Sequence, residues 1–351
     1  MSPVRPFPWW PTNVLYGAGT AVRRRLYGSG LLRTSHLSVP VISVGNISAG
    51  GTGKTPLVQW LVERLFAEGF KICVVSRGYG RPDPGKQVLA SDGRSVLAGA
   101  DRAGDEPALL AESLIGQAAV LCNVDRFAGA AWAVENLGSD LIILDDAFQH
   151  FQLDRTLDLV VVDASRPFDG LMREGVRALR RADAILLSRA ELASDLPKLH
   201  DLVSRASGGR PTFSAWLETT DLRPLAGSTK GTEIPAGARV SAFCGVGNPD
   251  SFFAQVKREP FELVYSSKFL DHKSYTQNDV NIVDRGAREA GANYLITTAK
   301  DEVKLRSLQF ELPVFVLVTT LFVDRAEDFL DLIKQILSTA VHTGSYGKAD
   351  R

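Results

Sequence analysis

Short apolar, β-branched runs alternate with helical patterns through the first half of the chain. We predict six strands from these runs, at Val39–Val44, Lys71–Ser76, Ala118–Cys122, Asp140–Leu144, Asp158–Val162 and Ala184–Leu187. Between the strands, apolar residues recur at the three- and four-residue spacing of one helix face. The first such set is Leu57, Val58, Leu61, Val62 and Leu65. Strands that alternate with helices predict an α/β fold built on a parallel sheet.

The pattern changes between residues 207 and 237, where Gly, Pro, Ser and Thr interrupt weak strands. Beyond this stretch we predict strands at Val240–Cys244 and Tyr294–Thr297 and a last helix at Ala326–Leu337. A chain of 351 residues is long enough for two domains. We therefore predict a larger domain over residues 1–215 and a smaller α/β domain over residues 216–351.

A glycine-rich loop joins the first strand to the first helix. Its sequence is Gly45-Asn46-Ile47-Ser48-Ala49-Gly50-Gly51-Thr52-Gly53-Lys54-Thr55-Pro56. The backbone N–H groups of such a loop bind phosphate, with the helix dipole behind them. The lysine reaches the β- and γ-phosphates, and the threonine hydroxyl holds Mg²⁺. Although Ser48 stands where the usual pattern has glycine, we predict a P-loop NTPase-like fold rather than a turn with a stray lysine.

Paired aspartates end the fourth strand. Four apolar residues lead into Asp145 and Asp146, which is the Walker B pattern, where a carboxylate holds Mg²⁺ or its waters. Ligands of parallel sheets bind beyond the carboxyl ends of the strands. We therefore expect these aspartates and the glycine-rich loop to meet at one edge of the sheet.

Two loops carry further candidates. Ser76-Arg77-Gly78-Tyr79-Gly80-Arg81 follows the second strand, and its glycines allow close approach to a phosphate or sugar. A solvated turn is the alternative for that loop. Ala103-Gly104-Asp105-Glu106-Pro107 places two carboxylates before a helix. Asp105 either caps this helix or accepts a hydroxyl proton during phosphoryl transfer.

Weaker candidates lie beyond the fourth and fifth strands. They are Gln149, His150, Asp163, Arg173 and Glu174. We take His150 as a structural histidine. Asp163, Arg173 and Glu174 belong to loops at the expected ligand edge, and a solvated surface is the alternative role for each.

Composition and charge narrow the possible functions. The formal net charge is zero, so no global field attracts nucleic acid, and we predict no nucleic-acid partner. A content of 45% hydrophobic and 23% charged residues is typical of a globular protein. Cys73, Cys122 and Cys244 have neither metal-binding spacing nor a disulfide framework. We predict that all three are buried thiols in a reducing compartment.

Proline and tryptophan dominate the N-terminus, and an arginine cluster follows them. The stretch Pro6-Phe7-Pro8-Trp9-Trp10-Pro11 cannot be helical throughout, whereas residues 12–27 have helical spacing and include Arg23, Arg24 and Arg25. No run of the about 20 apolar residues that a membrane-spanning helix needs occurs in the sequence. Aromatic residues beside arginines suit a helix in a membrane interface. An amphipathic helix packed on its own domain fits equally, and the sequence leaves both open.

These motifs, in this order, resemble those of the lipid A 4'-kinases, the tetraacyldisaccharide 4'-kinase family. The resemblance covers almost the whole chain. Its motifs are the basic helix before Val39-Pro40-Val41-Ile42, the loop Gly45 to Pro56, Ser76 to Arg81, Gly104 to Pro107, Asp145-Asp146 with Gln149-His150, Asp271-His272, and Thr298 to Lys304. The family shares the departure at Ser48. The segment Asp169 to Gly175 departs from the family, which has a proline-rich Leu-Arg-Glu-Pro version there.

The resemblance implies that ATP donates its γ-phosphoryl group to the 4'-hydroxyl of an acylated glucosamine disaccharide 1-phosphate, giving lipid IVA. It implies ATP and Mg²⁺ as cofactors, and a smaller domain that closes over the nucleotide site. The enzyme would be peripheral, on the cytoplasmic face of the inner membrane. Its partners would be the lipid substrate and an anionic membrane surface, with no obligate protein partner.

The resemblance also implies a role for each motif. We expect Lys54, Asp105 and His272 to be catalytic, with Asp105 taking the proton late because aspartate is too weak a base to remove it outright. The expected metal ligands are Thr55, Asp145, Asp146 and Glu106. The expected nucleotide contacts are Ser48, Ala49, Gly50, Gly51, Thr52, Gly53, Lys54, Thr55, Thr298, Lys300 and Asp301. The expected substrate contacts are Asn46, Arg77 and Tyr79.

Two other classes of P-loop protein compete with the kinase interpretation. One is a nucleotide-switched ATPase or GTPase of the ParA or metallochaperone kind, and the ParA group carries a signature lysine where Ala49 stands. The other is a GTP-dependent binding module that uses Thr298, Lys300 and Asp301 to recognise the base. Neither class explains a basic N-terminal helix together with Asp105 and His272.

Overall fold

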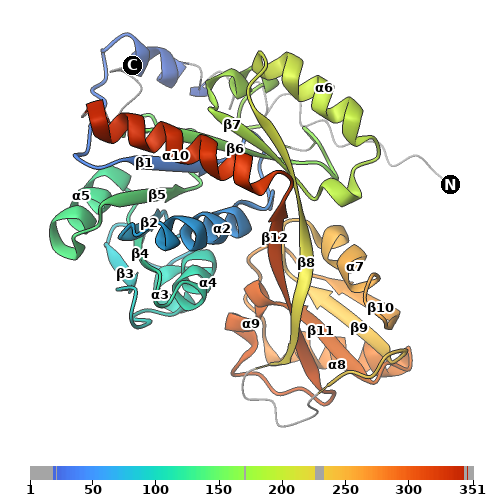
Figure 1. Ribbon diagram of the computed structural model, residues 1–351. Helices are drawn as coiled ribbons and strands as arrows, with labels where there is room; N and C mark the ends of the chain where they lie inside the picture. Colours follow the sequence, from blue (N-terminus) through green and yellow to red (C-terminus); the bar gives the residue numbers. More distant parts are fainter. Residues whose placement is uncertain (1–18, 21, 170, 226–232, 344–345, 347–351) are drawn as a thin grey trace. The chain divides into compact units, whose positions relative to one another are not determined.

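A computed structural model describes residues 19–20, 22–169, 171–225, 233–343 and 346 (Figure 1). The chain forms two compact units. The first consists of Met1–Lys54, Arg126–Ala215 and Val323–Arg351, and the second consists of Thr55–Asp125 and Trp216–Phe322. This division differs from the predicted domains because residues 55–125 group with residues 216–322. Closure of a smaller C-terminal domain over the nucleotide site stays a prediction.

The first unit is built on a parallel sheet with strand order β8–β7–β6–β1–β5. The strands are β1 (Val41–Gly45), β5 (Leu141–Asp145), β6 (Leu157–Asp163), β7 (Ala184–Ser188) and the start of β8 (Thr212–Pro224). β1 lies between β5 and β6, with Val44 opposite Asp145 and Gly45 opposite Val160. The carboxyl ends of β1 and β5 therefore meet at one edge.

Helices and 3₁₀ turns also belong to this unit. They are α5 (Arg126–Leu137), α6 (Leu196–Ser207) and α10 (Ala326–Thr343), with the 3₁₀ turns η1 (Val176–Arg181) and η2 (Ala190–Leu192). α6 begins where the Asp195 side chain accepts the Lys198 N–H and ends at the left-handed Gly208. Its buried Leu199 and Val203 pack on Ile185 and Leu187 of β7. α10 lies near β6 (Figure 1).

The second unit contains a three-stranded piece of sheet and two short helices near its beginning. β2 (Ile72–Ser76) pairs in parallel with β4 (Ala118–Cys122), and β3 (Val88–Ser91) pairs with β4 in the antiparallel direction. α2 (Lys54–Ala67) starts at the last residue of the first unit and continues in the second. α3 (Ala100–Ala103) and α4 (Asp105–Ser113) are separated by Gly104 alone.

The rest of the second unit has strand order β10–β9–β11–β12–β8. These strands are β9 (Arg239–Cys244), β10 (Glu262–Lys268), β11 (Tyr294–Thr298) and β12 (Val314–Val323), beside the end of β8. The helices are α7 (Pro249–Val256), α8 (Gln277–Glu289) and α9 (Ala299–Leu305). α8 begins with a capping box, in which Thr276 and Asp279 satisfy each other's backbone N–H groups. α9 packs against α4.

The predicted α/β fold class is confirmed, and a strand begins within two residues of each predicted start in the first half of the chain. β3, β10 and β12 were not predicted. β10 is a half-exposed strand with Glu262 and Lys268 at its ends, so it lacks the continuous apolar run of the predicted strands. Cys73, Cys122 and Cys244 are buried as free thiols, as predicted. Burial raises the pKa of Cys73 to about 12.

Near the N-terminus, residues 19–20 and 22–28 are helical, and the predicted stretch Pro6 to Pro11 lies outside the described residues. Tyr27 anchors the helix, since its ring centroid lies 6.2 Å from that of Phe151 in the same unit. Arg24 and Arg25 are exposed. Across the described ranges, no helix combines the length and apolar character needed to cross a bilayer.

Candidate active site

The glycine-rich loop leaves β1 through a point of very close packing. A Cβ atom on Gly45 would lie 2.5 Å from the Phe148 Cβ and 2.7 Å from the Phe148 N. Only glycine fits there, so the loop is pressed against the segment that follows Asp145 and Asp146. This contact brings the two predicted phosphate-site motifs together within the first unit.

Hydrogen bonds within the loop and from neighbouring segments stabilise its conformation. The Asn46 side chain donates to the Thr52 hydroxyl at 2.9 Å, and Gln149 donates to the Asn46 carbonyl at 2.8 Å. The Ser188 hydroxyl at the end of β7 donates to the Thr52 carbonyl at 2.7 Å. Asn46 is completely buried and supports the loop from inside. Its predicted contact with substrate stays a prediction.

The segment that departs from the family pattern lies against the loop. The Ala49 N–H donates to the Leu171 carbonyl at 2.7 Å, and the Arg173 N–H donates to the Ile47 carbonyl at 2.8 Å. Ser48 forms a β-bridge with Met172. The Ala49 N–H is therefore directed at Leu171 in this structure.

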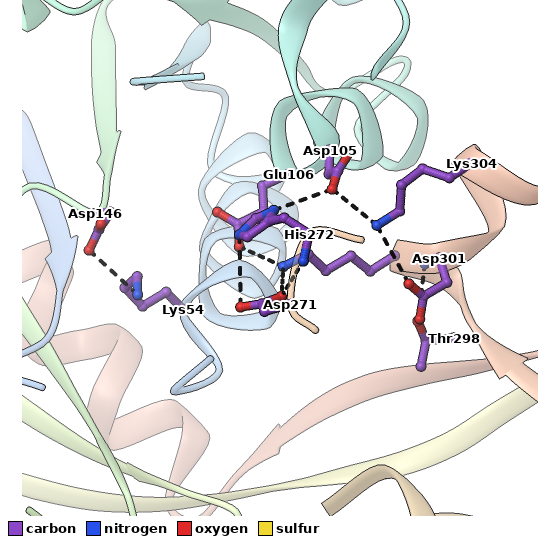
Figure 2. A network of polar contacts seen from close by, with 10 residues as sticks. Lys54, Asp105, Glu106, Asp146, Asp271, His272, Thr298, Asp301 and Lys304 are labelled. Carbon is purple, nitrogen blue, oxygen red and sulfur yellow. Dashed lines mark hydrogen bonds and ion pairs between the residues drawn. The ribbon is translucent and has the colours of Figure 1, made fainter. Parts of the chain in front are cut away.

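Lys54, Asp146 and Arg173 form a charged cluster beside the loop, and Figure 2 shows the contact between Lys54 and Asp146. The Asp146 Oδ1 lies 3.4 Å from the Lys54 Nζ and accepts from the Arg173 guanidinium at 2.7 Å. Burial raises the pKa of Asp146, but the charges of Lys54 and Arg173 outweigh burial and hold the pKa at about 2. Asp146 has φ +52°, an uncommon conformation for a residue other than glycine that often occurs at functional sites.

Glu174 lies in the same part of the unit and is buried. Its carboxylate takes two hydrogen bonds from Arg181, at 2.6 and 2.8 Å, and one from Gln149 at 3.0 Å. The sequence analysis offered a solvated surface as the alternative for Arg173 and Glu174. That alternative is wrong, because both side chains bind partners around the loop.

Asp105 is the first residue of α4 in the second unit, and the backbone conformation of the preceding Gly104 determines where it lies. Gly104 has φ +89°, and a Cβ there would lie 2.7 Å from the Tyr79 carbonyl oxygen. The N-cap position of α4 belongs to Gly104, and no side chain caps the helix there. The alternative in which Asp105 caps the helix is therefore wrong. Its carboxylate points instead to His272 and Lys304.

The Asp105 Oδ2 lies 3.2 Å from the His272 Nδ1 and accepts from the Lys304 Nζ at 3.1 Å (Figure 2). Burial raises the pKa of Asp105, but the hydrogen bond with His272 and the charge of Lys304 outweigh it, so the pKa lies below its ordinary value. His272 has φ +59°. The Tyr79 and His272 ring centroids lie 5.3 Å apart, and Tyr79 is 68% exposed.

A second group of opposite charges lies beside this pair. The Lys300 Nζ donates to Glu106 at 3.2 Å and to Asp271 at 3.1 Å. Burial lowers the pKa of Lys300, but Glu106 and Asp271 outweigh it and raise the pKa above its ordinary value. Glu106, predicted as a metal ligand, is thus bound to an ammonium group here. Its contact with a metal stays a prediction.

Thr298 and Asp301 support the start of α9. The Thr298 hydroxyl accepts the Asp301 N–H and donates to the Asp301 carboxylate at 2.8 Å. Asp301 is completely buried, and the Gly245 N–H donates to it at 3.0 Å. The base-reading role offered for these residues in a GTP-binding module needs an accessible carboxylate, and nucleotide contact by them stays a prediction.

Lys304 is the residue that the sequence analysis left without a role. It lies one helical turn beyond Lys300 on α9, and residues four apart share a helix face. That spacing predicts that both lysines face the same neighbour, but only packing shows that this neighbour is α4 with Asp105 and Glu106. Arg77 is exposed on the loop after β2, whereas Arg81 is buried and binds the Pro84 carbonyl.

The donor chemistry around the loop suits Mg²⁺. Thr55 supplies a hydroxyl and Asp145 a carboxylate, and Mg²⁺ prefers oxygen ligands, taking one or two carboxylates together with substrate phosphates. No group of three or more metal-binding side chains occurs among the described residues. Lys54 and the loop amides of the first unit suit an anion such as a phosphate, and the Asp105 carboxylate of the second unit is chemically able to accept a proton.

Comparison with known proteins gives one consistent result. Residues 7–338 match the family model described as tetraacyldisaccharide-1-P 4'-kinase. The chain is 39% identical over 313 residues to a tetraacyldisaccharide 4'-kinase of Geobacter sulfurreducens, covering 87% of this chain and 86% of that protein. It is 43% identical over 300 residues to one of Anaeromyxobacter, covering 83% and 80%. A crystal structure of LpxK from Aquifex aeolicus in complex with ATP aligns with TM-score 0.71 and 30% identity, covering 93% of this chain and 98% of that one.

Proposed function

Because the chain belongs to the tetraacyldisaccharide-1-phosphate 4'-kinase family, we propose that it transfers the γ-phosphoryl group of ATP to the 4'-hydroxyl of an acylated glucosamine disaccharide 1-phosphate. The match over residues 7–338 and the contact between Asp105 and His272 carry this proposal. The product is the 4'-phosphorylated lipid IVA, an intermediate of lipopolysaccharide synthesis.

On the ATP side, the loop amides and Lys54 hold the phosphates. Lys54 neutralises charge on the γ-phosphoryl group as it transfers, and such preorganised charges give most of the rate enhancement in phosphoryl transfer. Thr55 with Asp145 or Asp146 would hold Mg²⁺, which would offset the negative charge of the phosphates when bound. Arg173 is a further cation next to Asp146, and its pairing keeps that carboxylate ionised.

On the acceptor side, Asp105 takes the proton of the 4'-hydroxyl. Its lowered pKa keeps it ionised, and Lys304 holds it in place. An ionised carboxylate with a low pKa is a weak base, so the proton moves late, when the oxygen already bonds to phosphorus. The His272 ring, 3.2 Å away, orients the carboxylate and shares the proton. Arg77 and Tyr79 are exposed on the loop that follows β2, and they contact the sugar or its phosphate.

The N-terminal helix docks the enzyme on an anionic membrane surface, at the cytoplasmic face of the inner membrane. Arg24, Arg25 and Arg33 are exposed there, and Leu31 and Leu32 are exposed beside them. Arginines and exposed apolar residues together favour a membrane interface. Since Tyr27 also packs on Phe151, one face of the helix serves the fold and another the membrane.

The direct test is transfer of ³²P from γ-labelled ATP to a purified acylated disaccharide 1-phosphate. We expect a labelled lipid that depends on Mg²⁺ and on both substrates, and no label with Lys54→Ala. If the wild type transfers no more label than Lys54→Ala, the proposal is wrong. A switch ATPase would instead hydrolyse ATP on addition of a partner protein, and the comparisons do not favour that class.

A further inference from the structure

The starts of α8 and α9 carry the same local motif, a threonine followed three residues later by an aspartate. At α8 the Thr276 hydroxyl accepts the Asp279 N–H and donates to the Asp279 carboxylate, which also accepts the Thr276 N–H. At α9 the Thr298 hydroxyl likewise accepts the Asp301 N–H and donates to the Asp301 carboxylate. The local sequence therefore gives both aspartates the same helix-capping role.

Tertiary packing distinguishes the two aspartates. The Asp279 side chain is 15% exposed and binds Lys273 at 3.2 Å. The Asp301 side chain is completely buried, and its Oδ2 accepts the N–H of Gly245, which lies 56 residues earlier in the chain. A completely buried carboxylate needs a compensating charge, because an unpaired buried charge is costly. Asp301 therefore interacts with more than the start of its own helix.

The compensating charge is the ammonium group of Lys304, one turn along α9. The Lys304 Nζ lies 3.6 Å from the Asp301 Oδ1, an oxygen that has no hydrogen-bond partner among the described residues. The same ammonium group donates to the Asp105 Oδ2 at 3.1 Å (Figure 2). It also lies 5.6 Å from the centroid of the Tyr275 ring, within cation–π range. Two carboxylates and one aromatic ring thus surround this lysine.

The surroundings of Asp301 hold its carboxylate in place. A Cβ atom on Gly245 would lie 3.3 Å from the Asp301 Oδ1 and 2.9 Å from the Tyr275 hydroxyl, so both side chains pack directly on the Gly245 backbone. Burial and the nearby charge of Asp301 raise the pKa of Tyr275, so its hydroxyl stays neutral. The negative charge at this position therefore belongs to Asp301, and it faces Lys304.

Lys300 lies on the same face of α9 and provides a contrast. It binds Glu106 and Asp271, whose side chains are both 31% exposed. Ligands in solution can reach these carboxylates. They cannot reach the Asp301 carboxylate, which is completely buried. Its influence on the reaction must therefore pass through Lys304.

From these contacts we infer that Asp301 is a positioning residue for the proton acceptor, because it holds the Lys304 ammonium group where that group fixes the Asp105 carboxylate. The inference rests on the proposed kinase reaction and assigns the start of α9 to the acceptor side of it. Without the charge of Asp301, the buried ammonium group loses one of its two anionic partners. Asp105 then loses its alignment, and a displacement of about 1 Å can cost about 100-fold in rate.

Asp301→Asn is the first test, because asparagine keeps an oxygen that can accept from Gly245 and Thr298 but has no charge for Lys304. We expect kcat for lipid phosphorylation to fall about tenfold or more. Affinity for a non-hydrolysable ATP analogue, measured by calorimetry on the full chain, should stay within about twofold of wild type. Asp279→Asn is the matched control, since it changes the same motif at α8, and it should keep its kcat.

Two outcomes of this comparison would overturn the inference. One is equal kcat in Asp301→Asn and Asp279→Asn. The other is a loss of affinity for the ATP analogue in Asp301→Asn with unchanged kcat, because Asp301 would then belong to the nucleotide site. A wild-type protein that transfers no phosphate to the lipid would instead contradict the proposed kinase function itself.

A double-variant experiment tests whether Asp301 acts through Lys304. Lys304→Met removes the charge and keeps an unbranched side chain, and we expect it to lose kcat at least as strongly as Asp301→Asn. If Asp301 acts only through Lys304, the double variant should match Lys304→Met within about twofold. A double variant that is slower by the full factor of Asp301→Asn would overturn the inference.

Thr298→Val gives a milder test, because it removes the hydroxyl that orients Asp301 and leaves every buried charge in place. Thr276→Val removes the same cap from α8 and is its control. Both variants should lose similar thermal stability. Only Thr298→Val should lose kcat, by about fivefold, as when one hydrogen bond to a charged group is lost. Equal kcat in these two folded variants would show that the start of α9 serves only the fold, and the inference would be wrong.

Discussion

Asp105 and His272 lie 167 residues apart in sequence, and their side chains are in contact. His272 is held in the left-handed region, and Lys304 binds the same carboxylate oxygen from another helix. Asp105, His272 and Lys304 thus come from three separate segments and meet at the Asp105 Oδ2. Such convergence on a group that caps no helix is more typical of a catalytic site than of a structural one.

Substitutions at Asp105 separate catalysis from stability. Asp105→Asn keeps the size of the side chain but cannot take a proton, so we expect kcat to fall at least 100-fold with little change in ATP affinity. His272→Ala should lose kcat as well. Because residues that act as a unit are not additive, the double variant should be barely slower than the slower single variant.

The measurement is steady-state transfer to the lipid acceptor, with thermal unfolding recorded for each variant. Gln59→Ala is a suitable control, since Gln59 binds Ser113 on the exposed surface of the same unit. Near-normal kcat in Asp105→Asn would show that Asp105 is not the proton acceptor.

Acid should weaken the folded state partly through Asp146. Its pKa is about 2 in the folded protein, below the ordinary aspartate value of about 3.9. A carboxyl with a lowered folded-state pKa stabilises the fold fully above its unfolded pKa and loses this contribution as pH falls toward the folded value. We therefore expect the unfolding free energy of wild type to exceed that of Asp146→Asn by a constant amount above about pH 5.

That difference should shrink between about pH 4 and pH 2, and urea unfolding at several pH values measures it. Asp92→Asn is a control. Asp92 also has a lowered pKa, from backbone hydrogen bonds of Arg94 and Ser95, but it is exposed and binds no cation of the site. A wild-type minus Asp146→Asn difference that stays constant down to pH 3 would contradict stabilisation by Lys54 and Arg173.

At the scale of elements, the junction of α3 and α4 decides where Asp105 lies. Gly104 combines φ +89° with a close approach to the Tyr79 carbonyl, so the loop after β2 and the start of α4 fit only around glycine. From the facing side, α9 supplies Lys300 and Lys304 four residues apart. Arg306 also binds Glu112 of α4 through two hydrogen bonds, at 2.8 and 2.6 Å. The α4–α9 contact thus holds the acidic residues in place.

Gly104→Ala should displace the start of α4 and lower kcat by tenfold or more. The added methyl meets backbone, which cannot move aside as a flexible side chain could, and φ +89° with ψ +164° is a region restricted essentially to glycine, which adds about 1–3 kcal/mol of strain. Gly116→Ala is the matched control, because Gly116 has φ +84° and open space around it. It should lose some stability from its positive φ and keep its kcat. Equal kcat in the two variants, measured by lipid phosphorylation, would contradict the positioning role of Gly104.

At the scale of the whole molecule, the acceptor is a lipid while the described part of the chain has no membrane-spanning helix. The membrane contact proposed above involves exposed residues near the N-terminus, among them Arg24, Arg25 and Leu31. We predict that an Arg24→Ala/Arg25→Ala/Leu31→Ser variant loses sedimentation with anionic liposomes and has a raised KM for the lipid. Its KM for ATP should not change, since the substitutions remove attraction to headgroups and not the site.

Arg285→Ala with Arg288→Ala on α8 is the control, because it removes equal charge from an exposed helix elsewhere. It should sediment like wild type. Unchanged sedimentation of the N-terminal variant at about 0.1 M salt would show that this helix serves only the fold.

Sequence by itself determined the local parts of this protein. The β-branched runs predict the strands because their side chains fit a doubly covered sheet. The loop Gly45 to Pro56 predicts phosphate binding because glycine backbone, lysine and a helix start act together over adjacent residues. The position of Asp145 and Asp146 at the ligand edge is also predicted from adjacent residues, because they come at the end of a buried strand. Neighbours in sequence suffice for each of these predictions.

Only tertiary structure decided which distant groups meet. The pairing of Asp105 with Lys304, the burial of Asp163 against Arg189, and the enclosure of Glu174 by Arg181 and Gln149 depend on contacts between separate segments. A charged residue in a loop has the same sequence pattern whether it is solvated or paired. Packing removes water from some of these residues and leaves others exposed. A charged group that loses its water must bind a partner of opposite charge, because an unpaired buried charge is costly.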